Sequence, residues 1–317
     1  MIDSFGREIN YLRISVTDLC NLRCRYCIPL SGAPKLKHEN ILTLEEFYLI
    51  SEMFVSLGIN KIRITGGEPL LKKGIERLGK LHGLKTLALT TNGILLKEYA
   101  AELKDKGVER LNISIDTLDE QKYFYLTRGG NLGDVLDGIE QAKKVGFDSI
   151  KLNIVLIKGI NEDEIEQFTD LTRKENIDVR FIELMPIGKL SGWALERFIP
   201  NTMVLDKVKL LEKIEIQNPN SPAVYYKLKD AKRRVGLISS MTGRFCKACN
   251  RIRLSAHGRL KSCLHSNDEM DIKTPLRQGL DNLDLTDRIK EFIYKKPESH
   301  NLDTKEYIDK SMVQIGG

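Results

Sequence analysis

The first 185 residues alternate between two hydrophobic patterns. Short runs rich in aliphatic and β-branched residues are typical of buried strands; they read YLRISV, KIRIT, TLALT, RLNISI, SIKLNIVL and VRFIEL. Between them lie segments with apolar residues at helical spacing, and the first of these begins at a candidate N-cap, Thr43, and stops at Gly58. About six alternations predict parallel βαβ units in a doubly wound sheet or a partial barrel, and periodicity alone does not choose between these two.

The rhythm changes after residue 186. Loop-like stretches, PIGKLSGW and QNPNSPAVYY, separate short predicted strands that read YYKLKD, RRVGLIS and RIRLSA. These strands suggest a smaller antiparallel region, and a helix is expected near the end of the chain. We therefore divide the chain into an α/β unit, residues 1–186, and a C-terminal region, residues 187–317.

The composition is that of a globular protein with a core, because 41% of the 317 residues are hydrophobic and 30% are charged. A formal net charge of +6 suits a polyanionic small molecule but is too small to indicate nucleic acid. The N-terminus MIDSFGREIN lacks the apolar stretch of a signal peptide, and no stretch of about eighteen apolar residues suggests a membrane span. We expect a cytoplasmic protein, in which reduced thiols favour metal or redox chemistry over disulfides.

All six cysteines fall into two triplets. Cys20, Cys24 and Cys27 are spaced C-x-x-x-C-x-x-C directly after the first predicted strand. Three thiolates can hold three corners of a four-iron cluster and leave the fourth iron open to another ligand. Zinc is the main alternative metal, but a structural zinc site requires four ligands and this loop has no fourth Cys or His.

The second triplet lies in CKACNRIRLSAHGRLKSC and consists of Cys246, Cys249 and Cys263. It again suggests a cluster with one open iron. Zinc stays an alternative here, with His257 or His265 as the fourth ligand.

Basic residues recur within the predicted strands: Arg13, Lys61, Arg63, Lys151, Arg180, Arg251 and Arg253. Lys61 and Arg63 alternate along one strand, so both side chains project to the same side, and Arg251 and Arg253 do the same on another. Uncompensated charge that faces an interior is costly. A bound polyanion such as a triphosphate would compensate these cations, and arginine offers it bidentate hydrogen bonds.

Two motifs of the chain resemble those of the radical S-adenosylmethionine (SAM) superfamily. They are the cysteine loop, with Tyr26 before its third cysteine, and the segment ITGGEPLL, in which Gly66 and Gly67 would let backbone approach a ligand closely. The resemblance implies a partial (βα)6 TIM-like barrel with its cofactors at the C-terminal ends of the strands, closed by a C-terminal cluster-binding region. It also implies SAM contacts by Tyr26, Gly67, Ser114 and Met185.

A narrower resemblance covers the whole chain. The segments DLCNLRCRYC, KIRITGGEPLL, TTNG, LNISID, RFIELMPIG, SPAVYY, CKACNRIRLSA and the terminal Gly316-Gly317 are similar to the GTP 3′,8-cyclases of molybdenum cofactor biosynthesis. The sequence departs from that family at Ile28, at Ser221 and around the last cysteine, without loss of a ligand or of a matching basic residue. The resemblance implies radical SAM cyclisation of GTP to (8S)-3′,8-cyclo-7,8-dihydroguanosine 5′-triphosphate.

The same resemblance implies a role for each group of residues. The first cysteine triplet would hold a 4Fe–4S cluster that binds SAM, and the second triplet a 4Fe–4S cluster that binds the guanine. The seven cations, Thr90 and Ile252 would contact GTP, and the tail Gly316-Gly317 would assist catalysis. The implied partners are an electron donor, a downstream cyclic pyranopterin monophosphate synthase and a second copy of the chain in a homodimer, with no nucleic acid and no membrane. Two alternatives stay open: a radical SAM enzyme with a peptide or another small molecule as substrate, and a zinc-stabilised binding module.

Overall fold

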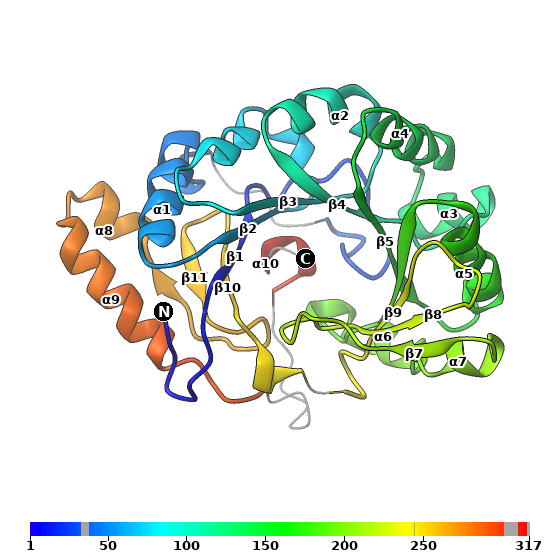
Figure 1. The fold of residues 1–317 in the computed structure, drawn as a ribbon. Coiled ribbons are helices and arrows are strands. Elements are labelled where there is room, and N and C mark those ends of the chain that lie inside the picture. Colours follow the sequence, from blue (N-terminus) through cyan, green and yellow to red (C-terminus); the bar gives the residue numbers. More distant parts are fainter. Residues whose placement is uncertain (33–37, 244, 301–309, 316–317) are drawn as a thin grey trace.

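The computed structural model describes residues 1–32, 38–243, 245–300 and 310–315. Twelve strands form one sheet in the order β12-β11-β10-β1-β2-β3-β4-β5-β6-β9-β8-β7. The sheet is curved, with helices α1 to α5 along its outer side (Figure 1). Within the described residues it has two edges, β12 and β7, and does not close into a ring.

The central strands are parallel and alternate with helices, which confirms the predicted α/β rhythm. In chain order these elements are β1 (Tyr11–Ser15), α1 (Leu44–Ser56), β2 (Lys61–Thr65), β3 (Thr86–Thr91), α2 (Leu96–Asp105), β4 (Val108–Ser114), α3 (Glu120–Thr127), α4 (Leu132–Lys144), β5 (Ser149–Leu156), α5 (Ile165–Lys174) and β6 (Ile177–Glu183). The connection from β2 to β3 differs from the others, because it contains two 3₁₀ helices, Pro69–Leu71 and Ile75–Lys80.

Local sequence explains where α1 begins and ends. The hydroxyl of Thr43 accepts a hydrogen bond from the backbone N–H of Glu46, whose carboxylate accepts one from the backbone N–H of Thr43. This capping box satisfies two N–H groups that a helix start leaves without partners. Gly58, with φ of +96°, turns the chain away just beyond the helix end.

The C-terminal region adds strands to both edges of this sheet. Its elements are α6 (Ser191–Glu196), α7 (Met203–Lys207), β7 (Glu212–Ile214), β8 (Val224–Lys227), β9 (Val235–Ile238), β10 (Arg251–Leu254), β11 (Arg259–Lys261), β12 (Met270–Asp271), α8 (Lys273–Arg277), α9 (Asn282–Tyr294) and α10 (Met312–Ile315). Strand β9 pairs with β6 and β10 pairs with β1, both in parallel, whereas β7–β8–β9 and β10–β11–β12 are antiparallel. The predicted antiparallel strands are therefore present, but as two extensions of one sheet rather than as a separate region.

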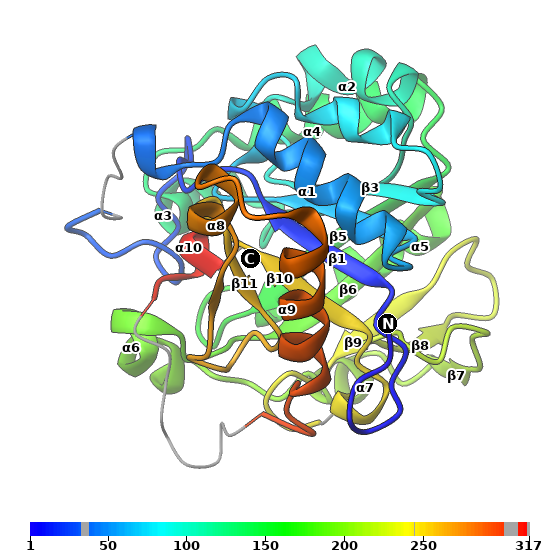
Figure 2. The same ribbon diagram turned by 90° about the vertical axis from the view of Figure 1, so that its left-hand side faces the viewer.

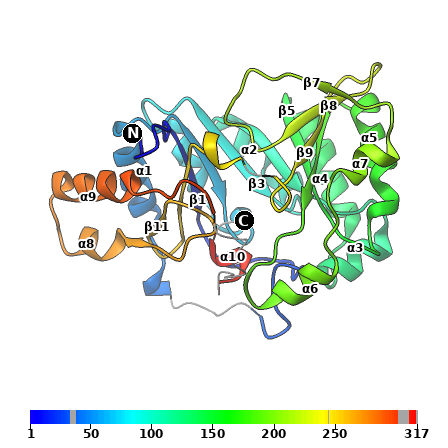
Figure 3. The same ribbon diagram turned by 90° about the horizontal axis from the view of Figure 1, so that it is seen from below.

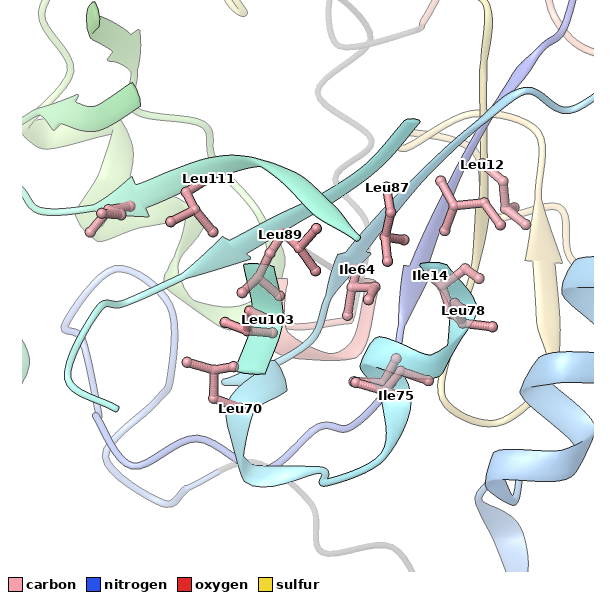
Figure 4. Close-up of a cluster of buried hydrophobic side chains, with 14 of the residues drawn as sticks. Leu12, Ile14, Ile64, Leu70, Ile75, Leu78, Leu87, Leu89, Leu103 and Leu111 are labelled. Carbon is pink, nitrogen blue, oxygen red and sulfur yellow. The ribbon is translucent and has the colours of Figure 1, made fainter. Parts of the chain in front are cut away.

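The core fills the space between the sheet and the outer helices. Leu12 and Ile14 of β1 and Ile64 of β2 are fully buried there, and Figure 4 shows them beside Leu87 and Leu89 of β3. Because side chains alternate along a strand, the residues between them face the inner side of the sheet. The side chains on this inner face form the candidate functional site.

Three C-terminal helices complete the layers around the sheet. Helices α8 and α9 lie beside β10 and β11 (Figure 2), and the short helix α10 lies on the inner side of the sheet, between β1 and α6 (Figures 1 and 3). None of the helices in the described part of the chain has the length and apolar composition that a membrane span requires.

Candidate active site

A cavity of about 1020 Å³ occupies the inner side of the sheet, and all six cysteines line it. The other predicted site residues that line it are Arg13, Tyr26, Lys61, Arg63, Gly67, Thr90, Ser114, Lys151, Arg180, Met185, Arg251 and Arg253. The structure therefore brings both cysteine triplets, the predicted SAM contacts and all seven cations into one chamber.

One predicted residue with a described position is not among the lining residues. Ile252 is fully buried in the hydrophobic core, on the face of β10 opposite Arg251 and Arg253. Its side chain cannot contact a ligand in the cavity, so only its backbone is left for the predicted GTP contact. Gly316 and Gly317 lie outside the described residues.

The loop that carries the first cysteine triplet is fixed to the end of α3. The backbone N–H groups of Arg23 and Arg25 donate hydrogen bonds to the carbonyl oxygens of Thr127 and Leu126, at 3.1 and 2.9 Å. These carbonyls belong to the last turn of the helix, where no intrahelical partner is available. The cysteine loop thus satisfies the end of α3 and is held rigidly by it.

The three thiols of this loop are free and lie close together. A turn, in which the N–H of Cys27 donates to the carbonyl oxygen of Cys24 at 2.9 Å, holds two of them on one side. Burial raises the pKa of Cys20, raises that of Cys24 well above its usual value and raises that of Cys27 to about 12. Burial disfavours the thiolate form of these three sulfurs unless a positive charge lies nearby. A metal centre would supply that charge, so the three grouped thiols suit a metal site.

The Gly-Gly segment after β2 packs directly on the backbone of this loop. The N–H of Gly67 donates to the carbonyl oxygen of Thr17 at 2.7 Å, and the N–H of Glu68 donates to that of Leu19, also at 2.7 Å. A Cβ on Gly67 would lie 2.2 Å from the carbonyl oxygen of Leu19 and 2.9 Å from that of Asp18. Only glycine fits this close approach, which fixes the end of β2 against the cysteine loop.

We expect Gly67→Ala to destabilise the fold and to impair assembly of the first metal centre. The added methyl group would push the cysteine loop away, at a cost of roughly 1–3 kcal/mol or more where backbone has to move. Thermal unfolding and iron content after anaerobic reconstitution measure the two effects. Gly192→Ala is the matched control, because a Cβ at that position has no heavy atom within 4 Å. Equal unfolding temperatures and equal iron in the two variants would contradict this role for Gly67.

A buried aspartate orients the predicted SAM contact Tyr26. The hydroxyl of Tyr26 donates to the carboxylate of Asp116 at 2.6 Å, and the N–H of Val155 donates to the same carboxylate at 2.9 Å. Burial raises the pKa of Asp116 to about 6. The sequence analysis missed Asp116, although an acidic residue two positions after a strand that ends in Ser114 was a visible signal.

Cations from three strands surround Tyr11, which also lines the cavity. The Nε of Arg63 donates to the Tyr11 hydroxyl oxygen at 2.6 Å, and the Lys61 ammonium lies 4.4 Å from the centre of the ring. Burial alone would raise the pKa of Tyr11, but Arg63, Arg13, Lys61 and Arg251 lower it to about 7. Burial in turn lowers the pKa of Lys61 to about 8. This end of the cavity carries an excess of positive charge that the phenol partly offsets.

The positive charge on β5 and β6 is partly compensated, because Lys151 pairs with a carboxylate whereas Arg180 pairs with a tyrosine hydroxyl. The Lys151 ammonium lies 2.7 Å from the carboxylate of Asp178, which Arg234 also contacts at 3.0 Å. The Nε of Arg180 donates to the hydroxyl of Tyr225 at 3.0 Å. Four further residues that were not predicted from the sequence line the cavity near the basic residues: Asn112, Arg110, Tyr225 and Arg234.

The second cysteine triplet repeats the local geometry of the first. The N–H of Cys249 donates to the carbonyl oxygen of Cys246 at 3.0 Å, as Cys27 does to Cys24. Burial would raise the pKa of Cys249, but Lys296 and Arg251 lower it. A thiol whose anion is already favoured is a good metal ligand.

The two histidines considered as zinc ligands lie apart. His265 lines the cavity with the second triplet, and burial lowers its pKa to about 3, so its ring is neutral. His257 does not line the cavity, and its Nε2 lies 3.1 Å from the carboxylate of Asp18. Among the residues with described positions, no three Cys, His, Asp or Glu side chains are arranged as a site for a single metal ion.

Comparison with known proteins agrees with this geometry. Residues 14–172 match the family model of the radical SAM superfamily, and residues 177–302 match the model named Molybdenum Cofactor Synthesis C. The fold is similar to that of Streptococcus suis SuiB bound to S-adenosylmethionine, with a TM-score of 0.62 and 16% sequence identity over 97% of this chain and 77% of that chain. The fold and the cysteine loop thus define a radical SAM protein.

The relatives narrow this class to one family. A GTP 3′,8-cyclase of Peptoclostridium acidaminophilum is 53% identical over 100% of this chain and 98% of the relative. GTP 3′,8-cyclases of Alkaliphilus metalliredigens and of Clostridium botulinum strain Hall are 50% and 45% identical, each over 100% of both chains. The chain belongs to the GTP 3′,8-cyclase family.

Proposed function

We propose that this protein converts GTP to (8S)-3′,8-cyclo-7,8-dihydroguanosine 5′-triphosphate, the first step of molybdenum cofactor biosynthesis. One observation carries the proposal: both cysteine triplets line the same cavity, together with cations from six strands. A site with two sulfur-rich corners and a basic wall suits a polyanionic nucleotide held beside a second cofactor.

The residues present fit two 4Fe–4S clusters. Cys20, Cys24 and Cys27 would hold one cluster, and Cys246, Cys249 and Cys263 the other, with one iron of each left open to a ligand. When bound, the first cluster and SAM supply a 5′-deoxyadenosyl radical, chemistry that belongs to the cofactors rather than to side chains. The protein contributes binding, orientation and exclusion of water.

Strand register supports an order of the two ligands along the cavity. Arg13 and Arg63 are cross-strand neighbours at the middle of β1 and β2, and Arg13 also lies level with Arg253 of β10, the strand that begins two residues after Cys249. Thr90 and Lys151 both lie level with Asn112, whereas Ser114 lies two residues further along β4, towards the first cysteine loop. GTP would therefore bind to the seven cations and Thr90, and SAM to Tyr26, Gly67, Ser114 and Met185.

The proposal includes finer features of the fold and of the protein's partners. The curved sheet would act as a partial (βα)6 barrel, and residues 187–317 would close it and bind the second cluster, with Gly316 and Gly317 assisting catalysis. An electron donor, a downstream cyclic pyranopterin monophosphate synthase and a homodimer complete the proposal, with a cytoplasmic location.

Replacement of Tyr11 by Phe is expected to flatten the pH dependence of GTP binding. The pKa of Tyr11 is about 7 in the protein, and a bound triphosphate beside the phenol would raise it, so binding takes up a proton. GTP affinity should then fall as pH rises above about 7, by up to about tenfold per pH unit from this group. Lys61, with a pKa of about 8, adds a fall at higher pH, and this fall should begin at a lower pH in Tyr11→Phe because Tyr11 raises the pKa of Lys61.

Calorimetric titration of the reconstituted protein from about pH 6 to about pH 9 measures this slope. Tyr226→Phe is the control, because Tyr226 is a tyrosine of β8 that is not among the residues lining the cavity. Equal slopes in Tyr11→Phe and the unchanged protein would show that Tyr11 takes up no proton.

The proposed activity is tested by anaerobic reconstitution with iron and sulfide, followed by incubation with GTP, SAM and dithionite. Mass spectrometry should detect the cyclised nucleotide and one 5′-deoxyadenosine for each product formed. A parallel incubation with peptides tests the alternative substrate class. The proposal would be overturned if the protein contained zinc and no iron. It would also be overturned if SAM were cleaved in the presence of GTP and no cyclised nucleotide formed.

A further inference from the structure

The short helix α10 lies on the inner side of the sheet (Figures 1 and 3). Met312 and Val313 line the cavity, and the backbone of Val313 lies close enough to the thiol of Cys27 to lower its pKa. Ile315 is buried and packs in one cluster with Ile187. We call residues 310–315 the anchor segment.

The anchor segment cannot hold this position by itself. Helices shorter than about 12–15 residues are marginal in water, and α10 has four residues. Within the segment, the N–H and the hydroxyl of Ser311 both donate to the side-chain oxygen of Gln314 at 3.0 Å. These bonds shape one turn but do not attach it to the rest of the protein.

An ion pair adds a polar attachment to the apolar packing of Val313 and Ile315. The ammonium of Lys310 lies 2.6 Å from both carboxylate oxygens of Glu269. The same carboxylate lies 3.5 Å from the ammonium of Lys261, whose side chain is 2% exposed. Glu269 is therefore both the counter-charge of the buried Lys261 and the partner of Lys310, and its removal would leave a buried cation without compensation.

A glycine allows the start of the segment to pack closely against the chain that follows β6. Gly188, just after β6, has φ of +62°. A Cβ there would lie 3.0 Å from the carbonyl oxygen of Lys310 and 3.4 Å from the Cα of Ser311. The anchor segment is thus held between Glu269, which precedes β12, and Gly188, which follows β6.

We propose that Glu269 and Lys310 are positioning residues that hold the anchor segment in the active-site cavity. The ion pair between them sets the fraction of time for which the segment completes the cavity wall beside Cys27. The effect on turnover rests on the proposed function, whereas the attachment itself does not.

Lys310→Ala tests the proposal in the full-length, anaerobically reconstituted protein. A lost charge-assisted contact should speed amide hydrogen exchange of residues 312–315 about tenfold and lower the rate of cyclised-product formation by a similar factor. Lys310→Arg keeps the charge and should restore both measurements. Glu269→Gln should speed exchange in the same way, and circular dichroism shows whether this second variant is folded.

Lys295→Ala is the matched control, because Lys295 is an exposed lysine on the surface that pairs with Glu291 at 2.7 Å. Unchanged exchange in Lys310→Ala, or equal increases in Lys310→Ala and Lys295→Ala, would overturn the attachment. Faster exchange with unchanged turnover would overturn the role in the reaction. If the unchanged protein forms no cyclised product at all, the proposed function fails and the exchange measurement still decides the attachment.

Discussion

Cys24→Ala is expected to abolish both SAM cleavage and formation of the cyclised nucleotide. The thiol of Cys24 lies at the centre of the first triplet, is buried and lines the cavity. Without it, two thiols remain in a loop that has no other sulfur or imidazole donor. Iron content should fall by about four atoms per chain, since the second triplet keeps its own cluster.

Cys263→Ala separates the two triplets in the same experiment. It should also lose about four iron atoms but keep SAM cleavage, because the first triplet is intact. Iron analysis, liquid chromatography of 5′-deoxyadenosine and mass spectrometry of the nucleotide measure the three properties. Full SAM cleavage in Cys24→Ala would show that the first triplet is not the SAM-binding centre.

Arg253→Ala and Arg251→Ala are each expected to keep SAM cleavage and to lose most of the cyclised product. Both side chains line the cavity from β10, and burial together with Arg251 lowers the pKa of Arg253 to about 10. A partly desolvated cation that binds a triphosphate or a guanine is worth about 2–5 kcal/mol, so product formation should fall about thirtyfold or more.

The control for this pair is Arg259→Ala, on the neighbouring strand β11. Arg259 pairs with Asp271 and does not line the cavity, so its loss should leave product formation unchanged. The ratio of cyclised product to 5′-deoxyadenosine is the informative measurement, because it separates substrate positioning from cofactor cleavage. An unchanged ratio in both Arg251→Ala and Arg253→Ala would remove these residues from the substrate site.

The elements of the first half could be predicted because hydrophobic alternation is a local signal. The run TLALT, for example, became β3 with its bounds shifted by at most one residue. The pairing of β10 with β1 could not be predicted in this way. The pattern RIRL shows which side chains share a face, but not which strand, from the other end of the chain, lies alongside.

The site followed from residue type, spacing and resemblance, and its gaps have physical reasons. Cysteines and buried cations carry a cost that demands a ligand, so they stand out in a sequence. Tyr11 and Asp116 were missed because a tyrosine or an aspartate in or after a strand is usually structural. Glu269 lies in a polar loop, and only the structure shows that two lysines meet there.

Strand β1 leads into the first cysteine loop, and β10 begins two residues after Cys249. The two strands run in parallel with Tyr11 opposite Arg251 and Ile14 opposite Leu254. The two sulfur-rich corners therefore stand at opposite ends of one hydrogen-bonded ladder, and a strand of five residues is about 17 Å long. Because backbone geometry rather than side chains sets this length, the two proposed ligands together must span it if one end of the pair is to reach each cysteine triplet.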